Sequence, residues 1–186
     1  MPVPPNMDWD QVYADTKNWE NDVPFMYLDT NGHVTVAVGK LIPNTQAAQR
    51  LGFVNRLSGA KATATEIGQD YASVVTQESG HTALYYKKFT ALDLPSAQRM
   101  ALLHQDVAEA DAQLARRFRN YMSYPVNARR ALIDMCFNIG SGNFAHFPKM
   151  NAACEAGDWH GAASECRRSG ISPERNEWTR ALFLSC

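Results

Sequence analysis

The segment at residues 25–38 constrains the fold of this chain more than any other stretch does. Two runs typical of β-strands, residues 25–28 and 33–38, flank the four residues Asp-Thr-Asn-Gly. In the second run, apolar residues alternate with smaller or polar ones, as they do in a half-buried strand. Asn-Gly adopts the positive backbone angles that tight hairpin turns require. We therefore predict a β-hairpin near the start of the chain.

Helical patterns flank this hairpin on both sides. Apolar residues recur at roughly helical spacing from residue 9, which predicts a first helix that runs up to Glu20. Thr63 and Glu66 form a capping-box pattern, which predicts a helix that begins there and reaches about residue 77.

The clearest helical pattern begins at Ser96. Apolar residues then follow an alternating spacing of three and four down to Phe118, which predicts a long amphipathic helix. Residues 127–140 are more apolar, and we expect them to form the buried centre of a helical lobe. Three shorter helices are expected after it, at residues 149–156, at 159–168 and from the Ser-Pro-Glu at 172–174 onward.

The order of these elements predicts an α+β fold with a helical majority. A length of 186 residues suits one domain over residues 1–186, divided into two lobes around a cleft. We place an N-terminal lobe with the hairpin at about residues 8–95 and a helical lobe at about 96–186. The stretch at 44–92 has the fewest recognisable patterns.

Charge and hydropathy exclude several classes of protein. The formal net charge is −1, so the whole chain has no electrostatic signature of nucleic-acid binding. No segment approaches the roughly 18 apolar residues that a membrane span needs, and the first residues lack the pattern of an export signal. Residues 112–133 hold five arginines and no acid. This patch could meet an anionic polymer, or it could be an exposed helix end.

The cysteines and histidines show no metal-binding pattern. The four cysteines lack CxxC pairs and the five histidines lack paired ligand spacing, so we expect no metal and no cofactor. Cys154 and Cys166 lie on two short predicted helices, where they either form a disulfide or remain two buried thiols. Cys136 lies in an apolar helix, which argues against a nucleophilic thiolate.

Three residues around the hairpin could carry chemistry. Glu20 ends the first helix, Asp29 opens the turn and Thr35 lies in the second strand, so a helix end beside a hairpin could bring them together. Glycoside hydrolysis needs a carboxylic acid that protonates the leaving oxygen and a second carboxylate that activates water. Such an acid should be partly desolvated, and Trp19 could provide apolar surroundings. By spacing alone, the two acids could equally be ordinary surface residues.

This arrangement resembles the phage-type lysozymes of glycoside hydrolase family 24. Glu20, eight residues, Asp29, five residues and Thr35 follow the signature of that family. Further segments resemble the family in the same order along the chain: residues 102–107, residues 129–140, Phe147, Asp158-Trp159 and residues 172–175.

The resemblance implies a lysozyme-like fold and a muramidase that cleaves bacterial peptidoglycan between N-acetylmuramic acid and N-acetylglucosamine with inversion. In that reading Glu20 is the general acid, Asp29 is the second catalytic carboxylate and Thr35 positions the attacking water. Arg175 matches an arginine that pairs with the catalytic glutamate, although it could also be a surface residue in the first turn of a helix.

Other positions match the family less closely. Leu41, Phe137 and Asn138 correspond to residues that line the saccharide cleft, although Phe137 could also be core, and Asn138 is shorter than the usual glutamine. Lys40 stands where these enzymes often carry histidine, and Asp106 matches the acidic partner of that histidine, so we expect an ion pair between them. Ala37 replaces a glycine, a change that is harmless if the backbone there has an ordinary φ.

An alternative from another class is a lysozyme-like module that binds the cell wall without catalysis. For an enzyme made in the cytoplasm without an export signal, two routes to periplasmic peptidoglycan are open. One is release through a holin lesion, and the other is delivery by a secretion machinery as part of an antibacterial toxin effector. The second route would imply an immunity protein as a partner. We expect the protein to be a monomer.

Overall fold

The computed structural model describes residues 6–186 and has the expected helix-rich α+β fold. The start of the Pro-containing leader lies outside the described residues. The chain packs as two compact units, with boundaries after Trp19 and inside the long helix α5 (Ser96–Arg117). One unit is Glu20–His104, and the other combines Met1–Trp19 with Gln105–Cys186. Among the described residues, no helix is long and apolar enough to cross a bilayer.

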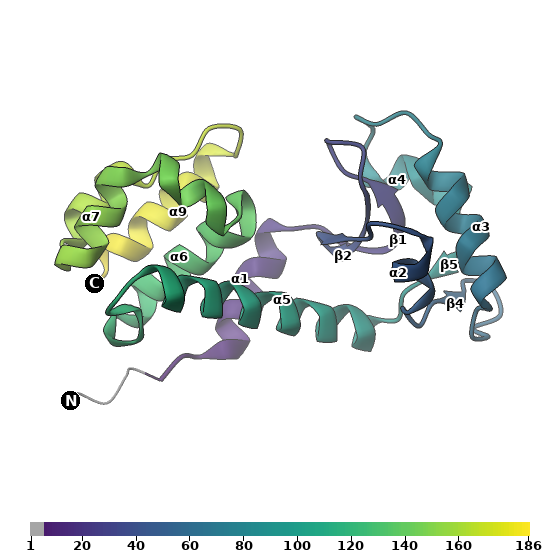
Figure 1. The fold of residues 1–186 in the computed structure, drawn as a ribbon, viewed down its shortest axis with the longest axis horizontal. Helices are drawn as coiled ribbons and strands as arrows, with labels where there is room; N and C mark the ends of the chain where they lie inside the picture. Colours follow the sequence, from purple (N-terminus) through teal and green to yellow (C-terminus); the bar gives the residue numbers. More distant parts are fainter. Residues whose placement is uncertain (1–5) are drawn as a thin grey trace. The chain divides into compact units, whose positions relative to one another are not determined.

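The predicted hairpin is confirmed and forms most of a three-stranded antiparallel sheet in the unit Glu20–His104 (Figure 1). Its strands are β1 (Asp22–Leu28), β2 (Val34–Val38) and β3 (Lys40–Leu41). The turn closes through hydrogen bonds from Asp29 N to His33 O and from Gly32 N to Asp29 O. Gly32 has a φ of +81°, the left-handed conformation that glycine adopts without a steric cost.

Ala37 lies at an irregular point of this sheet. The register of β1 against β2 shifts between Val23 and Tyr27, as at a β-bulge. Ala37, which pairs with Val23, has a φ of +56°, unlike any other described non-glycine residue. Alanine in place of glycine was expected to be harmless only at an ordinary φ. The φ of Ala37 is positive, so the replacement is not harmless. A left-handed alanine costs roughly 1–2 kcal/mol.

We expect Ala37→Val to lower the free energy of unfolding by about 2–4 kcal/mol, because β-branching is poorly tolerated at positive φ and the site is buried. Ala37→Gly should stay within about 1 kcal/mol of wild type, since relieved strain offsets the lost methyl group. Urea denaturation measures both values. Ala48→Val is the matched control at a fully buried helical alanine. Equal costs for the two valine variants would contradict the assignment of strain.

The stretch at 44–92 forms short elements around the hairpin sheet: α2 (Thr45–Gln49), β4 (Val54–Asn55), α3 (Ala64–Val75), α4 (Ala83–Tyr86) and the 3-10 helix η1 (Lys87–Phe89), followed by β5 (Leu92–Asp93). The predicted capping box at Thr63 and Glu66 is confirmed at the start of α3. Both α3 and α4 contact β1 (Figure 1). They help to cover an apolar core that includes Met26, Phe53 and Tyr86.

Two buried or half-buried charges hold the end of this stretch in place. The carboxylate of Asp70 accepts hydrogen bonds from the backbone N–H groups of Ala91 and Leu92, each at 2.9 Å. Arg56 donates to Asp93 and to the carbonyl oxygen of Thr90. The sequence separations are 21 to 37 residues, so tertiary contacts determine this segment more than local propensity does.

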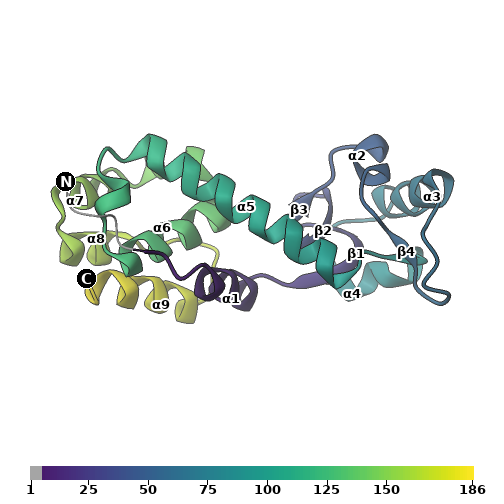
Figure 2. The ribbon, with the colours of Figure 1, turned by 90° about the horizontal axis from the view of Figure 1, so that it is seen from below.

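The second unit is helical: α1 (Trp9–Trp19), most of α5 (Ser96–Arg117), the 3-10 helix η2 (Tyr121–Ser123), α6 (Val126–Ile139), the 3-10 helix η3 (Ser141–His146), α7 (Pro148–Ala156), α8 (Trp159–Glu165) and α9 (Pro173–Leu184). The helices predicted after Ser96 are confirmed, although α8 ends three residues earlier than expected. Within this unit α6 contacts α1 and α9, and α8 contacts both α7 and α9 (Figure 2). As predicted, α6 is largely buried.

Helix α1 belongs to this helical unit, whereas the sequence placed it with the hairpin. The reason is a set of contacts that no local pattern reveals. The guanidinium of Arg130 on α6 binds the carboxylate of Asp15 on α1 at 2.8 Å, and the rings of Trp19 and Trp178 lie 5.6 Å apart. The α1 helix is thus fixed by α6 and α9.

Candidate functional site

The unit Glu20–His104 contains the three residues predicted to be catalytic. Glu20 follows the last residue of α1 and is half-buried. Asp29 follows β1 in the hairpin turn and is also half-buried, and Thr35 lies in β2. Trp19, the expected source of apolar surroundings for Glu20, packs on Trp178 of α9.

Asp29 is fixed by the turn that it opens. Its Oδ1 accepts hydrogen bonds from the backbone N–H groups of Asn31, at 2.9 Å, and His33, at 2.8 Å. Its Oδ2 lies 3.5 Å from Nδ1 of the exposed His33 side chain. One carboxylate oxygen is therefore held by the turn, while the other lies beside the His33 imidazole.

A row of three side chains crosses the sheet. Thr35 pairs with Tyr27 on one side and with Leu41 on the other, so the three side chains share one face of the sheet. The exposed fraction is 3% for Thr35 and 51% for Leu41. The Thr35 hydroxyl donates to the carbonyl oxygen of His33 at 3.1 Å. Leu41 thus offers apolar surface beside a hydroxyl that is already oriented by its own strand.

Tyr27 is the residue that links this row to the two carboxylates. Burial, together with the nearby negative charges of Glu20 and Asp29, raises the pKa of Tyr27 to about 12. The phenol therefore stays protonated at neutral pH and can donate a hydrogen bond. Tyr27 was not among the site residues predicted from the sequence. The available signal was its position in the first strand of the hairpin, two residues before Asp29.

We expect Glu20→Gln and Asp29→Asn each to lower the pKa of Tyr27, because either change removes a negative charge that disfavours the phenolate. NMR of 13C-labelled tyrosine measures this titration, and Tyr27→Phe identifies its signal. Glu78→Gln serves as the control, since the exposed Glu78 does not contribute to the shift. A titration that neither active-site variant moves would show that Tyr27 is remote from both carboxylates.

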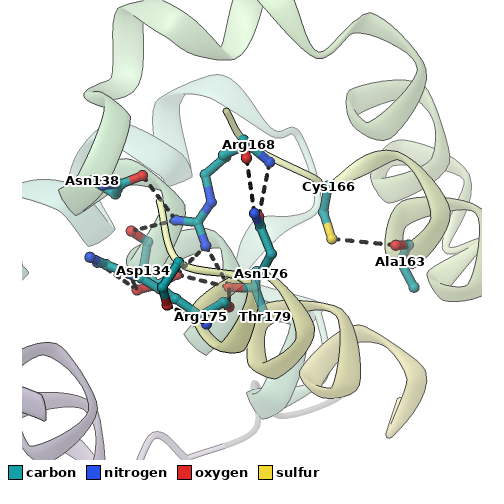
Figure 3. A network of polar contacts seen from close by, with 9 residues as sticks. Asp134, Asn138, Ala163, Cys166, Arg168, Arg175, Asn176 and Thr179 are labelled. Carbon is teal, nitrogen blue, oxygen red and sulfur yellow. Dashed lines mark hydrogen bonds and ion pairs between the residues drawn. The ribbon is translucent and has the colours of Figure 1, made fainter. Parts of the chain in front are cut away.

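Arg175 lies on α9, where it is nearly buried and binds Asp134 of α6 (Figure 3). Its Nε donates to Asp134 Oδ1 at 2.9 Å. Arg168 donates to Asp134 Oδ2 at 2.7 Å, and the Thr179 hydroxyl donates to the same oxygen at 2.9 Å. Burial lowers the pKa of the Arg168 guanidinium, and Asp134 opposes that shift. Arg175 is therefore not a surface residue, and its pairing with Glu20 stays a prediction.

Asn138 joins the same network. Arg168 Nη1 approaches Asn138 Oδ1 at 3.4 Å, as Figure 3 shows. Asn138 and its neighbour Phe137 are both half-buried, so Phe137 is not plain core. Asp134 and Arg168 were not among the residues predicted from the sequence. An acidic residue inside the otherwise apolar run 131–137 was the signal that could have identified Asp134, because such a charge must find partners.

The two residues of the predicted ion pair, Lys40 and Asp106, lie in different secondary-structure elements. Lys40 is in β3 and Asp106 is in α5, on the two sides of the boundary between the units, and both are half-buried. Their ion pair stays a prediction.

The cysteines are free thiols, so Cys154 and Cys166 are not bridged. Both are buried, and burial raises the pKa of Cys154 to about 12 and also raises that of Cys166. Burial likewise raises the pKa of Cys136 to about 11. A thiolate nucleophile at Cys136 is disfavoured at neutral pH, as its apolar helix predicted.

Comparison with known proteins points to one family. The profile of the family described as Phage lysozyme matches residues 55–172, more than half of the chain. The chain is also 30% identical over 144 residues to the pre-baseplate central spike protein Gp5 of Enterobacteria phage T4. That similarity covers 77% of this chain but only 22% of the phage protein. The profile match includes Asn138 and lies outside Glu20, Asp29 and Thr35.

Proposed function

The chain belongs to the phage lysozyme family, and on this premise we propose that it is a muramidase with its catalytic centre at Glu20, Asp29 and Thr35, assisted by Tyr27. Membership of this family implies glycoside hydrolase activity on peptidoglycan. The finer proposal is cleavage of the β-1,4 bond between N-acetylmuramic acid and N-acetylglucosamine. The proposal is supported by the family match and by the half-buried Tyr27, where burial and then the negative charges of Glu20 and Asp29 raise the pKa of the phenol to about 12.

In the proposed reaction Glu20 protonates the glycosidic oxygen, and Asp29 acts on the opposite face of the sugar through its Oδ2. Thr35 positions the attacking water, which gives inversion at the anomeric carbon. Tyr27 donates a hydrogen bond that orients a carboxylate or the sugar. Arg175 is proposed to position Glu20. This role rests on the resemblance to the family; within its own unit Arg175 shares the carboxylate of Asp134 with Arg168.

The test is mass spectrometry of fragments released from purified sacculi. We expect reducing N-acetylmuramic acid without an anhydro ring, and NMR during the reaction should detect the inverted anomer first. An anhydro product would identify a lytic transglycosylase instead. The cell wall is the proposed site of action, and lysis of permeabilised bacteria is the expected consequence.

A second candidate function is binding to the wall without catalysis. It is favoured by the turn, where Asp29 accepts two backbone hydrogen bonds, and by Thr35, which donates within its own strand. Both residues would then serve only the hairpin. Cosedimentation with sacculi without any released fragment would support this candidate.

A further inference from the structure

Three arginines cluster where α5 ends. Arg116 and Arg117 lie in the last turn of α5, Arg119 follows it, and all three side chains are exposed. The other two arginines of the basic stretch serve the fold, since Arg129 binds Asp111 and Arg130 binds Asp15.

The guanidinium groups of the cluster lie beside two hollows. Arg116 and Arg117 line an open hollow of about 830 Å³, together with residues of α5, η3 and α7. A neighbouring hollow of about 510 Å³ is lined by the same two arginines, by Arg119 and by Asn120. All the lining residues belong to the helical unit, and none is among those proposed for catalysis. The two hollows share Arg116, Arg117 and Glu155 and so form one continuous open surface.

The positive charges of this surface are not neutralised by ion pairs among the described residues. Within residues 6–186, no ion pair joins the side chains of Arg116, Arg117 or Arg119 to a carboxylate. Glu155 is the acidic residue of both hollows, and one of its oxygens accepts the backbone N–H of Arg119 at 3.1 Å. Three guanidinium groups therefore face one carboxylate.

The surface is partly preorganised. The guanidinium of Arg117 lies 5.4 Å from the centre of the buried Phe144 ring, a cation–π contact that limits its freedom. The backbone of Gly142 borders the hollow, and a Cβ built on it would meet nothing within 4 Å. An extended ligand can therefore approach the main chain there.

We propose that this surface, the arginine groove, binds the carboxylate-bearing stem peptides of peptidoglycan, an inference that rests on the proposed function. Guanidinium groups bind carboxylates through two parallel hydrogen bonds. Glu155 suits an ammonium group, and the amides of Gln113 and Asn120 suit peptide groups. A phosphate polymer would leave Glu155 opposed to like charge, so the lining favours a peptide with both carboxylates and an amine. The groove would supply local attraction that a net charge of −1 does not.

The test measures equilibrium binding of the Glu20→Gln protein to sacculi by cosedimentation. Replacing Arg116, Arg117 and Arg119 by glutamine should weaken binding about tenfold, the combined effect of three exposed ion pairs. The matched control replaces the exposed Arg50, Arg167 and Arg180, which changes the net charge equally. We expect the control to stay within twofold. An equal loss of binding in both triple variants would show that net charge alone causes the effect, and it would overturn the proposal.

Two further arms identify the ligand. On glycan strands whose peptides have been removed by an amidase, the groove variant should bind as well as its parent. A difference that persists there, or that appears instead with lipopolysaccharide vesicles, would overturn the proposal. NMR titration of the unmutated groove with free stem peptide should shift the signals of Gln113 and Asn120, and this keeps the test valid if the triple variant misfolds. Unchanged spectra would overturn the proposal.

The two proposals can fail separately. Hydrolysis is read from fragments released by the wild-type protein, whereas the groove is read from binding alone. Peptide-dependent binding without released fragments would leave the groove in place and refute the muramidase. Released fragments with no peptide-dependent binding would do the reverse.

Discussion

Asp134→Ala is expected to lower the free energy of unfolding by about 4 kcal/mol. Asp134 is 4% exposed, and it pairs with Arg168 and Arg175, which are 3% and 6% exposed. Its removal leaves two buried guanidinium groups close to each other without the carboxylate between them. Breaking a buried ion pair by removing one partner typically costs about 3–5 kcal/mol. Urea unfolding followed by the fluorescence of Trp178 measures this loss.

The matched control is Glu177→Ala on the same helix as Arg175. Glu177 also pairs with an arginine, Arg180, at 2.7 Å, but both side chains are largely exposed. Such pairs contribute roughly 0–1 kcal/mol. Comparable costs for Asp134→Ala and Glu177→Ala would contradict the buried network. Replacing Asp134 and Arg168 together by leucine and methionine should cost less than Asp134→Ala, because one buried guanidinium group, that of Arg175, rather than two is then left without the carboxylate.

Glu20→Gln is expected to lower the rate of sacculus hydrolysis by about a thousandfold, within the range by which general acids accelerate reactions. Glutamine keeps the size of the side chain and removes the transferable proton. That factor corresponds to about 4 kcal/mol of activation free energy. The measurement is the initial rate at which reducing ends are released. Glu78→Gln, which removes one exposed carboxylate from the same unit, should leave the rate unchanged.

Asp29→Asn separates catalysis from folding at the hairpin. An asparagine oxygen can still accept the backbone N–H groups of Asn31 and His33, so the hairpin should keep its stability within about 1 kcal/mol. The rate should nevertheless fall, because the amide cannot act as a carboxylate. A fully active Asp29→Asn protein would limit Asp29 to its role in the turn.

Local chemistry made much of the fold predictable. The Asn-Gly turn, the capping box at Thr63 and the apolar spacing after Ser96 each act over a few residues, and each gave an element close to its observed position. In contrast, α2, β4, β5 and α4 were not predicted. They are short and depend on distant partners, as Arg56 does on Asp93 and Asp70 does on Ala91.

Some residues of the candidate site could likewise be predicted from the sequence, and others could not. Glu20, Asp29 and Thr35 stand at spacings that a single sequence can reveal. Tyr27 becomes part of the site only through the pairing of β1 with β2, which brings it opposite Thr35. Asp134 in α6 and Arg168 in the segment between α8 and α9 are 34 residues apart, and no local pattern indicates that they meet.

The unit Glu20–His104 is one uninterrupted stretch, whereas the helical unit is completed from both sides of it. Asp15 and Arg130, whose side chains pair, are 115 residues apart. Since a growing chain leaves the ribosome from its N-terminus, the inserted unit has all its residues available before α6 is made. Helix α1 must wait for α6 and α9. During synthesis the unit Glu20–His104 should therefore fold first. Helix α1 should dock last, in the slow step that such distant contacts impose.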